Sequence, residues 1–368
     1  MTLSILLLTS CELYDAPIAN PISTQTPHLL NITPDSPQKT DDIISLGYYT
    51  GTQASYDAML TFSSFLDIVS VDVYGLDFDG NIIGVDEFTV AAHNTSDAIQ
   101  FYACINNWNS DPAVDKFDSA LAQTAIVIKK DKIISQLVSL SQSEGYSGVN
   151  IDLEDIAYPG KTEEARADFS AFIHELAEKL HKTGKKLIIS VPGKSTDDIN
   201  NEWTYPFDLA ALGKEADYLQ LMTYDQHGSW GDPGPVSGVD WLQEVLNYTT
   251  SIVEPSKLLI GLPAYGYDWD LSTYDPEKWT YSTTSFSWID VPMLYAKQGV
   301  ETHWDAASHS PYVTYTENRH DHVAWFENTE SITAKVKLVP QHKLGGFSVW
   351  ALGMENIQFW RATENSNN

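Results

Sequence analysis

Residues 148–155 read GVNIDLED, a stretch in which apolar and polar side chains alternate. Successive side chains of an extended strand point to opposite faces, so Asn150, Asp152 and Glu154 share one face and the apolar residues between them share the other. A row of polar groups inside a protein is unfavourable unless its members bond one another or act on a ligand. The stretch therefore predicts a strand whose polar row points toward a functional site at its carboxyl end.

Seven further β-rich runs lie along the chain, and segments with helical spacing separate most of them. The clearest helix is predicted over 163–183, where apolar side chains recur every three or four residues. Such an alternation favours parallel strands joined by helices. The eight predicted strands are 43–49, 68–74, 98–106, 148–154, 186–192, 218–224, 257–264 and 345–350, and the other predicted helices are 53–64, 112–123, 130–144, 207–214, 239–252 and 329–340.

Eight strands alternating with helices over roughly 320 residues match the size of a (β/α)8 TIM barrel. A doubly wound open sheet is the rival fold, but no glycine-rich phosphate-binding turn follows the first strand. We assign 43–362 to an α/β barrel and 363–368 to a polar tail. The segment 267–328 is too long for an ordinary loop and is rich in Trp and Tyr, which predicts a small inserted α+β subdomain between strands seven and eight.

The N-terminal part of the chain, up to residue 42, differs in composition from the rest. Residues 1–11 are mostly apolar and end in Leu-Thr-Ser-Cys, which resembles the lipidation motif of bacterial lipoprotein signals, although no Lys or Arg precedes the apolar run. Residues 12–42 are rich in Pro, Ser and Thr and predict a tether. We expect lipidation at Cys11 and export to the outer face of a bacterial membrane or to the periplasm, with secretion if Cys11 is unmodified. A frayed N-terminus is the alternative.

The charge balance and the cysteines exclude several classes of partner. The chain carries 21 basic and 50 acidic side chains, a formal net charge of −29, which disfavours binding to nucleic acid or anionic lipid. Cys11 and Cys104 have no metal-ligand spacing and cannot form a disulfide framework. We expect no metal and no cofactor, and we interpret Cys104 as a buried core thiol. The 11 Trp and 19 Tyr residues suit either stacking on sugar rings or packing in a large core.

Four further motifs lie in chain order on the predicted strands: LGYY at 46–49, LMTYD at 221–225, GLPAYGY at 261–267 and GGFSVW at 345–350. Together with GVNIDLED they resemble the motifs of glycoside hydrolase family 18, the chitinases and their relatives. The strand-four signature of that family is Asp-x-x-Asp-x-Asp-x-Glu. The chain keeps its last two acidic residues as Asp152 and Glu154, but Ser147 and Asn150 stand at the two earlier aspartate positions.

The resemblance implies a substrate-assisted mechanism, in which the N-acetyl group of the sugar attacks the anomeric carbon. It implies that Glu154 is the catalytic acid and base. It also implies that Asp152 hydrogen-bonds the N–H of the acetamido group and that Tyr224 holds the acetamido oxygen. Trp350 is expected to stack beneath the sugar. The other expected substrate-site residues are Asp225, Asn150, Met222, Tyr48, Tyr265 and Trp269.

Some of these positions carry expectations of their own. Asn150 is expected to hydrogen-bond Asp152, but an amide cannot take a proton from that carboxyl group, so we expect a shifted pH profile in an active enzyme. Tyr48, Tyr265 and Trp269 suit the wall of a sugar subsite and plain packing about equally well.

The likeness is greater to the spore-cortex-lytic N-acetylglucosaminidase and chitobiase-like branch than to large chitin-degrading enzymes, because of Asn150, YDQH at 224–227 and GYDW at 266–269. It implies a monomeric, retaining glycosidase that cleaves β-1,4 linkages next to N-acetylglucosamine in chitin oligomers or peptidoglycan. Two alternatives stay open. One is a non-hydrolytic sugar-binding lectin, which the retained Glu154 and Asp152 argue against, and the other is an endo-β-N-acetylglucosaminidase acting on N-glycan cores.

Overall fold

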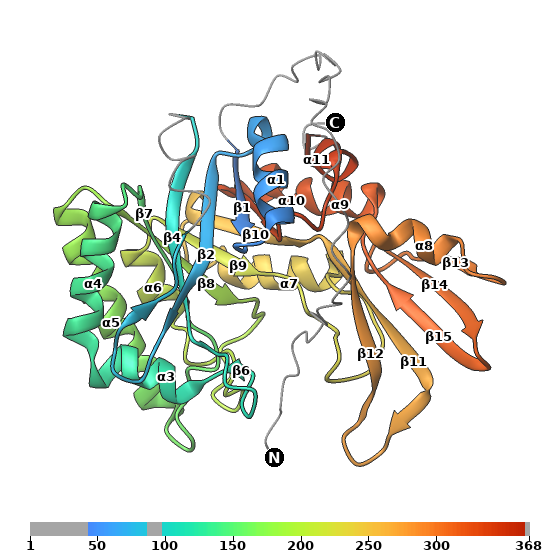
Figure 1. The fold of residues 1–368 in the computed structure, drawn as a ribbon, viewed down its shortest axis with the longest axis horizontal. Helices are drawn as coiled ribbons and strands as arrows, with labels where there is room; N and C mark the ends of the chain where they lie inside the picture. The colour runs from blue at the N-terminus through green and yellow to red at the C-terminus, as the bar shows by residue number, and fades with distance from the viewer. Residues whose placement is uncertain (1–42, 87–97, 365–368) are drawn as a thin grey trace, which may run out of the picture.

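The computed structural model describes residues 43–86 and 98–364, and its centre is a closed barrel of eight parallel strands (Figure 1). The first barrel strand pairs with both the second and the last, which closes the sheet. The predicted (β/α)8 TIM barrel is therefore confirmed. In sheet order its strands are β1 (Ile44–Tyr49), β16 (Gly346–Trp350), β10 (Leu258–Pro263), β9 (Tyr218–Met222), β8 (Lys186–Pro192), β7 (Gly148–Asp152), β4 (Gln100–Asn106) and β2 (Ile68–Leu76).

Several sequence predictions concern residues beyond this description. The predicted signal segment 1–11 with Cys11, the tether 12–42, and residues 365–368 of the predicted tail lie outside the described residues. Over the part of the chain that is described, no helix has both the length and the apolar character needed to cross a bilayer.

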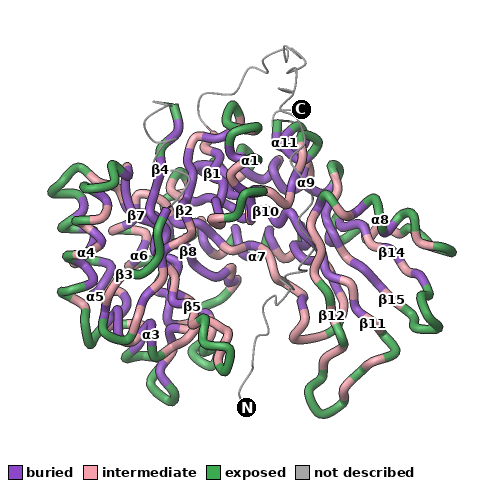
Figure 2. The backbone as a smooth tube through the Cα atoms, viewed as in Figure 1, coloured by how far each residue is buried: buried purple, intermediate pink, exposed green. Residues whose placement is uncertain are grey.

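Helices cover the outside of the barrel, and a cluster of buried apolar residues packs between them and the strands. Figure 2 shows the barrel strands largely buried and the outer turns of the helices exposed. Helix α5 (Thr162–Lys182) follows the predicted pattern, because the apolar side chains on its inner face are at most 1% exposed: Phe169, Phe172, Ile173, Leu176, Ala177 and Leu180. The other barrel helices are α1 (Gln53–Thr61), α3 (Ser119–Gln123), the π-helix η2 (Thr124–Ile128), α4 (Lys130–Ser143), α6 (Leu209–Glu215), α7 (Val239–Thr249), α9 (Thr329–Val336), α10 (Leu338–His342) and α11 (Ile357–Thr363), with 3-10 turns η1 (Ser63–Phe65) and η3 (Pro255–Lys257).

The predicted helix over 112–123 is wrong in its first half. There the chain forms β6 (Lys116–Phe117), which pairs with β5 (Trp108–Asn109) as a short antiparallel ribbon. The side chain of Asp118 then accepts a hydrogen bond from the backbone N–H of Ala120, so it caps the start of α3. A cap residue in an apparently periodic segment thus sets where the helix begins.

The interior of the barrel is small and partly polar. Its polar side chains bond across strands: the Tyr48 hydroxyl lies 2.9 Å from Ser190 Oγ and donates to Gln220 Oε1 at 3.2 Å, and Gln220 Nε2 donates to Ser348 Oγ at 2.9 Å. These bonds satisfy groups that no water reaches. The buried apolar residues of the interior are Leu46, Tyr48, Ile68, Tyr102, Cys104, Ile188, Leu259 and Ala351.

The last strand approaches the first so closely that its start must be glycine. A Cβ atom on Gly346 would lie 1.9 Å from the carbonyl oxygen of Ile44, and no heavy atoms approach that closely without a bond. The second glycine of the motif GGFSVW is therefore required for closure of the barrel between β16 and β1.

Between β10 and β16 the chain leaves the barrel and forms a separate antiparallel sheet, drawn in orange in Figure 1. The inserted α+β segment predicted between strands seven and eight is present, and its first strand begins at Tyr265. Its elements, in sheet order, are β12 (Thr280–Ser287), β11 (Tyr265–Asp275), β15 (His320–Trp325), β14 (Ser310–Glu317) and β13 (Glu301–Asp305), with α8 (Val291–Tyr295) and the 3-10 turn η4 (Trp288–Asp290) between β12 and β13; β3 (Ile82–Ile83) is a short antiparallel partner of β2.

A fully buried ion pair joins the end of the inserted sheet to the barrel. Lys335 Nζ on α9 donates to Glu327 Oε2 at 2.6 Å, and neither side chain is exposed. Burial raises the pKa of Glu327 and lowers that of Lys335, so each charge is tolerated only because the other is present.

Removing one partner should therefore destabilise the fold strongly. We expect Lys335→Met to lower the free energy of unfolding by about 3–5 kcal/mol, because Glu327 then has no cation inside the protein. The double variant Lys335→Met/Glu327→Met should recover most of that loss. Urea unfolding measures both, and a Lys335→Met protein within about 1 kcal/mol of the wild type would contradict the role of the pair.

Candidate active site

The strand that carries Asp152 ends earlier than predicted, and a side chain from the end of the neighbouring strand β4 holds the residues that follow it. Strand β7 stops at Asp152. Beyond it, the backbone N–H of Glu154 donates to Asn107 Oδ1 at 2.8 Å, and Asn107 Nδ2 donates to the carbonyl of Glu154 at 2.7 Å. Asn107 was missed by the sequence analysis, although its place just after the third barrel strand is where functional groups of a barrel lie.

Asp152 is nearly buried at the mouth of the barrel, with 5% of its surface exposed. A hydrogen bond from Ser190 favours its carboxylate, but burial, and next to it the charge of Asp72, raises the pKa of Asp152 to about 7. Its Oδ1 atom is buried and has no hydrogen-bond partner. A buried acceptor without a donor is unfavourable, so this oxygen is suited to an N–H or O–H group brought by a ligand.

Glu154 lies beside Asp152 and remains partly exposed. Its pKa is raised well above the ordinary value, first by burial and then by the neighbouring anions Asp152 and Asp225. Burial is thus the larger cause of the shift, and repulsion between the carboxylates adds to it. A glutamic acid that keeps its proton at neutral pH is suited to act as a general acid.

Asn150 does not make the expected hydrogen bond to Asp152. Its Nδ2 donates to the Tyr48 hydroxyl at 3.0 Å, to Ser70 Oγ at 2.9 Å and to Cys104 Sγ at 3.4 Å. Side chains two residues apart on one strand are separated by about 6.6 Å along it, so neighbouring strands offer closer partners. Asn150 is fully buried and supports the site from below rather than lining it.

Asp225 is held in an unusual backbone conformation by two tyrosines. Its φ is 56°, in the left-handed region that residues other than glycine seldom adopt. The hydroxyls of Tyr265 and Tyr267 donate to its Oδ1 atom at 2.6 and 2.9 Å. Burial raises the pKa of Asp225, and these two hydrogen bonds lower it. Tyr267 was not among the predicted site residues, since its only sequence signal is its place in the GLPAYGY motif.

Met222 and Trp350 are the last residues of β9 and β16, whereas Tyr224 lies two residues beyond β9, which ends earlier than predicted. All three side chains are partly exposed. The ring of Tyr224 packs edge-on to that of Tyr265, 6.4 Å between centroids. A Cβ atom on Gly261 would lie 2.6 Å from the Tyr224 ring, so glycine in strand β10 makes room for it. The structure thus gathers Asp152, Glu154, Tyr224, Asp225 and Trp350 at one end of the barrel.

Two of the predicted substrate contacts are packing residues. Trp269 has no exposed surface, and its Nε1 donates to the carbonyl of Gly228 at 3.2 Å. Tyr48 is 1% exposed, and its ring lies 5.1 Å from that of Trp350. Neither ring offers a face to a sugar, which corrects the expectation of direct contact. Tyr265 is also buried and acts on the site through its hydroxyl.

Stacked rings extend from this end of the barrel along the inserted sheet. Trp325 and Tyr312 pack in the same cluster as Tyr224 and Trp350. Tyr312 stacks on Trp325 with 4.3 Å between ring centroids, and His303 stacks on Tyr312 with 4.7 Å between centroids. Tyr312 is thus covered on both faces, so the partly exposed rings at the two ends of the row, Trp325 and His303, are the ones suited to contact a sugar.

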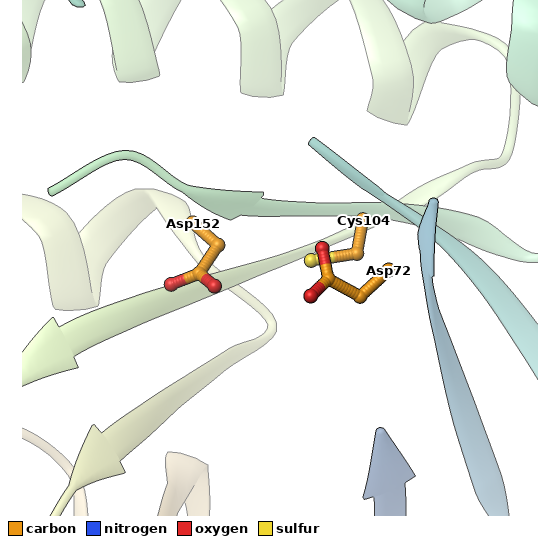
Figure 3. Close-up of side chains that lie close together, drawn as sticks. All are labelled: Asp72, Cys104 and Asp152. Carbon is orange, nitrogen blue, oxygen red and sulfur yellow. The ribbon is translucent and has the colours of Figure 1, made fainter. Parts of the chain in front are cut away.

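A third acidic side chain, Asp72, approaches Asp152 from strand β2. One ligand atom each of Asp72, Cys104 and Asp152 lies within 4.8 Å of the others (Figure 3). Burial raises the pKa of Asp72 to about 6 and that of the Cys104 thiol well above its ordinary value. A thiol that keeps its proton is a poor metal ligand, so this group is better suited to holding protons than a cation. Cys104 is buried, as predicted.

A relationship to known proteins covers most of the chain. The profile described as "Glycosyl hydrolases family 18" matches residues 44–355. The chain is a member of this family. It is 34% identical over 322 residues to the uncharacterized glycosylase YvbX of Bacillus subtilis, which covers 87% of this chain and 90% of YvbX. The crystal structure of a chitinase from Chromobacterium violaceum has a TM-score of 0.80 at 34% identity and covers 88% of this chain and 98% of that one.

A more distant relative is the cortical fragment-lytic enzyme of Bacillus anthracis, 26% identical over 243 residues that make up 65% of this chain and 54% of that enzyme. The chain thus spans about half the length of that relative. The family and its chitinase neighbours identify the chain as a glycosidase with a chitinase-like fold.

The raised carboxyl pKa values make stability depend on pH. Asp152 titrates near its ordinary value when unfolded and at about 7 when folded, so its contribution to stability is complete below about pH 4 and is lost as pH rises to about 7. We expect the free energy of unfolding in urea to fall between about pH 5 and about pH 8, and to fall less, by on the order of 2 kcal/mol, in Asp152→Asn. The exposed Asp131→Asn serves as a control; equal slopes in all three proteins would contradict the shift.

Proposed function

We propose that this glycosidase hydrolyses β-1,4 linkages next to N-acetylglucosamine, in chitin oligomers or peptidoglycan, with retention of configuration and with the substrate's own N-acetyl group as nucleophile. The observation that carries the proposal is the pairing of Glu154, whose pKa is raised by burial and by neighbouring anions, with Asp152, whose buried Oδ1 lacks a donor. An acetamido N–H is a donor of the right kind for that oxygen. Two neighbouring carboxyl groups thus have separate roles: Glu154 donates the proton and Asp152 binds the acetamido group.

The first chemical step breaks the glycosidic bond. Glu154 transfers its proton to the leaving oxygen while the acetamido oxygen attacks the anomeric carbon, giving an oxazolinium ion and a free alcohol. Asp152 accepts the acetamido N–H, and its negative charge stabilises the positive ring. The hydroxyl of Tyr224 holds the acetamido oxygen on the line of attack, and Trp350 stacks beneath the sugar.

The second step restores the enzyme. Glu154, now a carboxylate, takes a proton from a water molecule that attacks the same face from which the alcohol left. The oxazolinium ring opens, the acetamido group is regenerated and the product keeps its configuration. Asp225, fixed by Tyr265 and Tyr267, lines the same subsite.

Two observations bear on the substrate. The name of the Bacillus anthracis relative refers to cortical fragments, and that of the Chromobacterium violaceum protein to chitin. Both polymers contain N-acetylglucosamine, the sugar whose N-acetyl group the mechanism needs. The net charge of −29 gives no attraction to anionic cell-wall polymers, which favours neutral oligosaccharides that contact the partly exposed ring of Trp325.

We also propose, from the sequence alone, that the enzyme is exported and anchored through a lipid on Cys11, with residues 12–42 as a tether, and that it acts as a monomer. A neutral-sugar hydrolase on a tether reaches polymers outside the cell without needing a charged surface. Labelling with a radioactive fatty acid in bacteria, compared between the wild type and Cys11→Ala, tests the anchor.

Hydrolysis of 4-methylumbelliferyl chitobioside and chitotrioside, beside purified peptidoglycan, tests the activity. We expect turnover by the wild type and a loss of about 1,000-fold in Glu154→Gln, which keeps the shape of the side chain but cannot donate a proton. Asp152→Asn should also lose activity, since its neutral amide does not stabilise the oxazolinium ion.

The two alternatives give different results in this assay. Binding of N-acetylglucosamine oligomers without turnover by the wild type would indicate a lectin. Turnover restricted to N-glycan cores would indicate an endo-β-N-acetylglucosaminidase. Full activity in Glu154→Gln would refute the assigned acid.

A further inference from the structure

The carboxyl group of Asp72 reaches the catalytic pair from a strand on which the catalytic motif does not lie. Strands β2 and β7 both pair with β4, and in that register Asp72 is beside Cys104, while Asn106 is beside Asp152. Figure 3 shows the Asp72 carboxyl group and the Cys104 thiol side by side and directed toward Asp152 at this level of the barrel. Asp72 lies 80 residues before Asp152 along the chain, and only the parallel register brings them together.

The partners of Asp72 are neutral donors. Asn106 Nδ2 donates to Asp72 Oδ1 at 2.9 Å, and the Cys104 thiol donates to the same carboxyl group. These bonds fix the side chain but leave its charge uncompensated, so joint ionisation of Asp72 and Asp152 in one water-poor site is unfavourable. The titratable groups facing this pair are Tyr48 on β1, Cys104 on β4, Glu154 and Asp155 after β7, and Tyr224 and Asp225 after β9.

Asn150 cannot play this part, although it precedes Asp152 on the same face of the strand. Its amide bonds Tyr48, Ser70 and Cys104 and accepts no proton. Asp72 is therefore the group through which Asp152 can lose and regain a proton without exposing it to water.

We propose that Asp72 is a positioning residue that acts through Asp152: the two carboxyl groups share one proton across strands β2 and β7, and Asp72 keeps it when Asp152 turns its charge toward substrate. The inference rests on the proposed function. In the resting enzyme the shared proton relieves the repulsion between the two groups. When the acetamido N–H reaches Asp152 Oδ1, the proton stays on Asp72, and Asp152 is the anion that faces the oxazolinium ion. No net proton is gained or lost.

The first test is the variant Asp72→Asn, which keeps the hydrogen-bonding shape and removes the charge. The Asp72 anion disfavours ionisation of both Asp152 and Glu154, so its removal lowers their pKa values, and the acid form is lost at lower pH. We expect the alkaline limb of the kcat/KM profile to move down by about one pH unit and kcat to fall about 10-fold or more, with KM little changed. Asp67→Asn, a partly buried carboxyl at the other end of β2, is the matched control.

The second test moves the carboxyl group to the other side of the thiol. Asn150 already contacts Cys104 Sγ at 3.4 Å, so Asp72→Asn/Asn150→Asp places a proton acceptor beside the same sulfur. We expect this double variant to regain most of the kcat lost in Asp72→Asn and to return the alkaline limb toward the wild type. A structural role for Asp72 predicts no such rescue. An Asp72→Asn profile that overlays the wild type would overturn the proposal.

The third test does not depend on turnover. Raised carboxyl pKa values make the unfolding free energy fall as pH rises, and proton sharing requires that Asp72→Asn and Asp152→Asn each reduce that slope while the double variant reduces it by less than their sum. Additive slopes would refute the sharing. Coupled slopes in a protein that hydrolyses none of the substrates would uphold the carboxyl pair and refute the proposed function instead.

Discussion

Burial of several carboxyl groups at one end of a closed barrel is the constraint on which the rest of the site depends. The charged neighbours that most affect Asp152 and Glu154 are other acids, and the groups that bond this acidic cluster are neutral. Ser190 bonds Asp152, Asn106 bonds Asp72, and Asn107 bonds the backbone of Glu154. A cation would lower the carboxyl pKa values, whereas neutral donors hold the side chains in place and leave those values high. The arrangement therefore trades stability at neutral pH for acids that keep their protons.

The sequence predicted what depends on local periodicity. Alternation placed Asp152 and Glu154 at the mouth of a barrel strand, and three- and four-residue spacing located α5 with its buried face. Helix 112–123 was wrong because a single capping aspartate, Asp118, decides where that helix starts. A capping residue is a weaker signal in the sequence than a hydrophobic pattern, and here the hydrophobic pattern indicated a longer helix.

Contacts between strands far apart in the chain were the part that the sequence did not reveal. Asn107 and Asp72 belong to strands whose register against β7 follows from barrel closure, and no spacing rule within one strand predicts it. The expected bond between Asn150 and Asp152 failed for the same reason, since the nearest partners of an inward side chain lie across the sheet. Burial of Trp269 likewise results from its packing against the segment after β9, where its Nε1 donates to the carbonyl of Gly228, a contact that its own motif does not indicate.

The two hydrogen bonds that hold Asp225 constrain how the inserted sheet can change in evolution. The hydroxyls that hold this residue come from Tyr265 and Tyr267, at the very start of β11, where the chain has just left the barrel. Surface loops of a barrel are exchanged freely in evolution because the strands beneath them do not change. This insertion is different, because a replacement that lacked the two hydroxyls would remove the hydrogen bonds that hold Asp225 in its left-handed backbone conformation after strand six. The distal part of the sheet can diversify, whereas its first three residues, 265–267, must be retained together with the site at the end of the barrel.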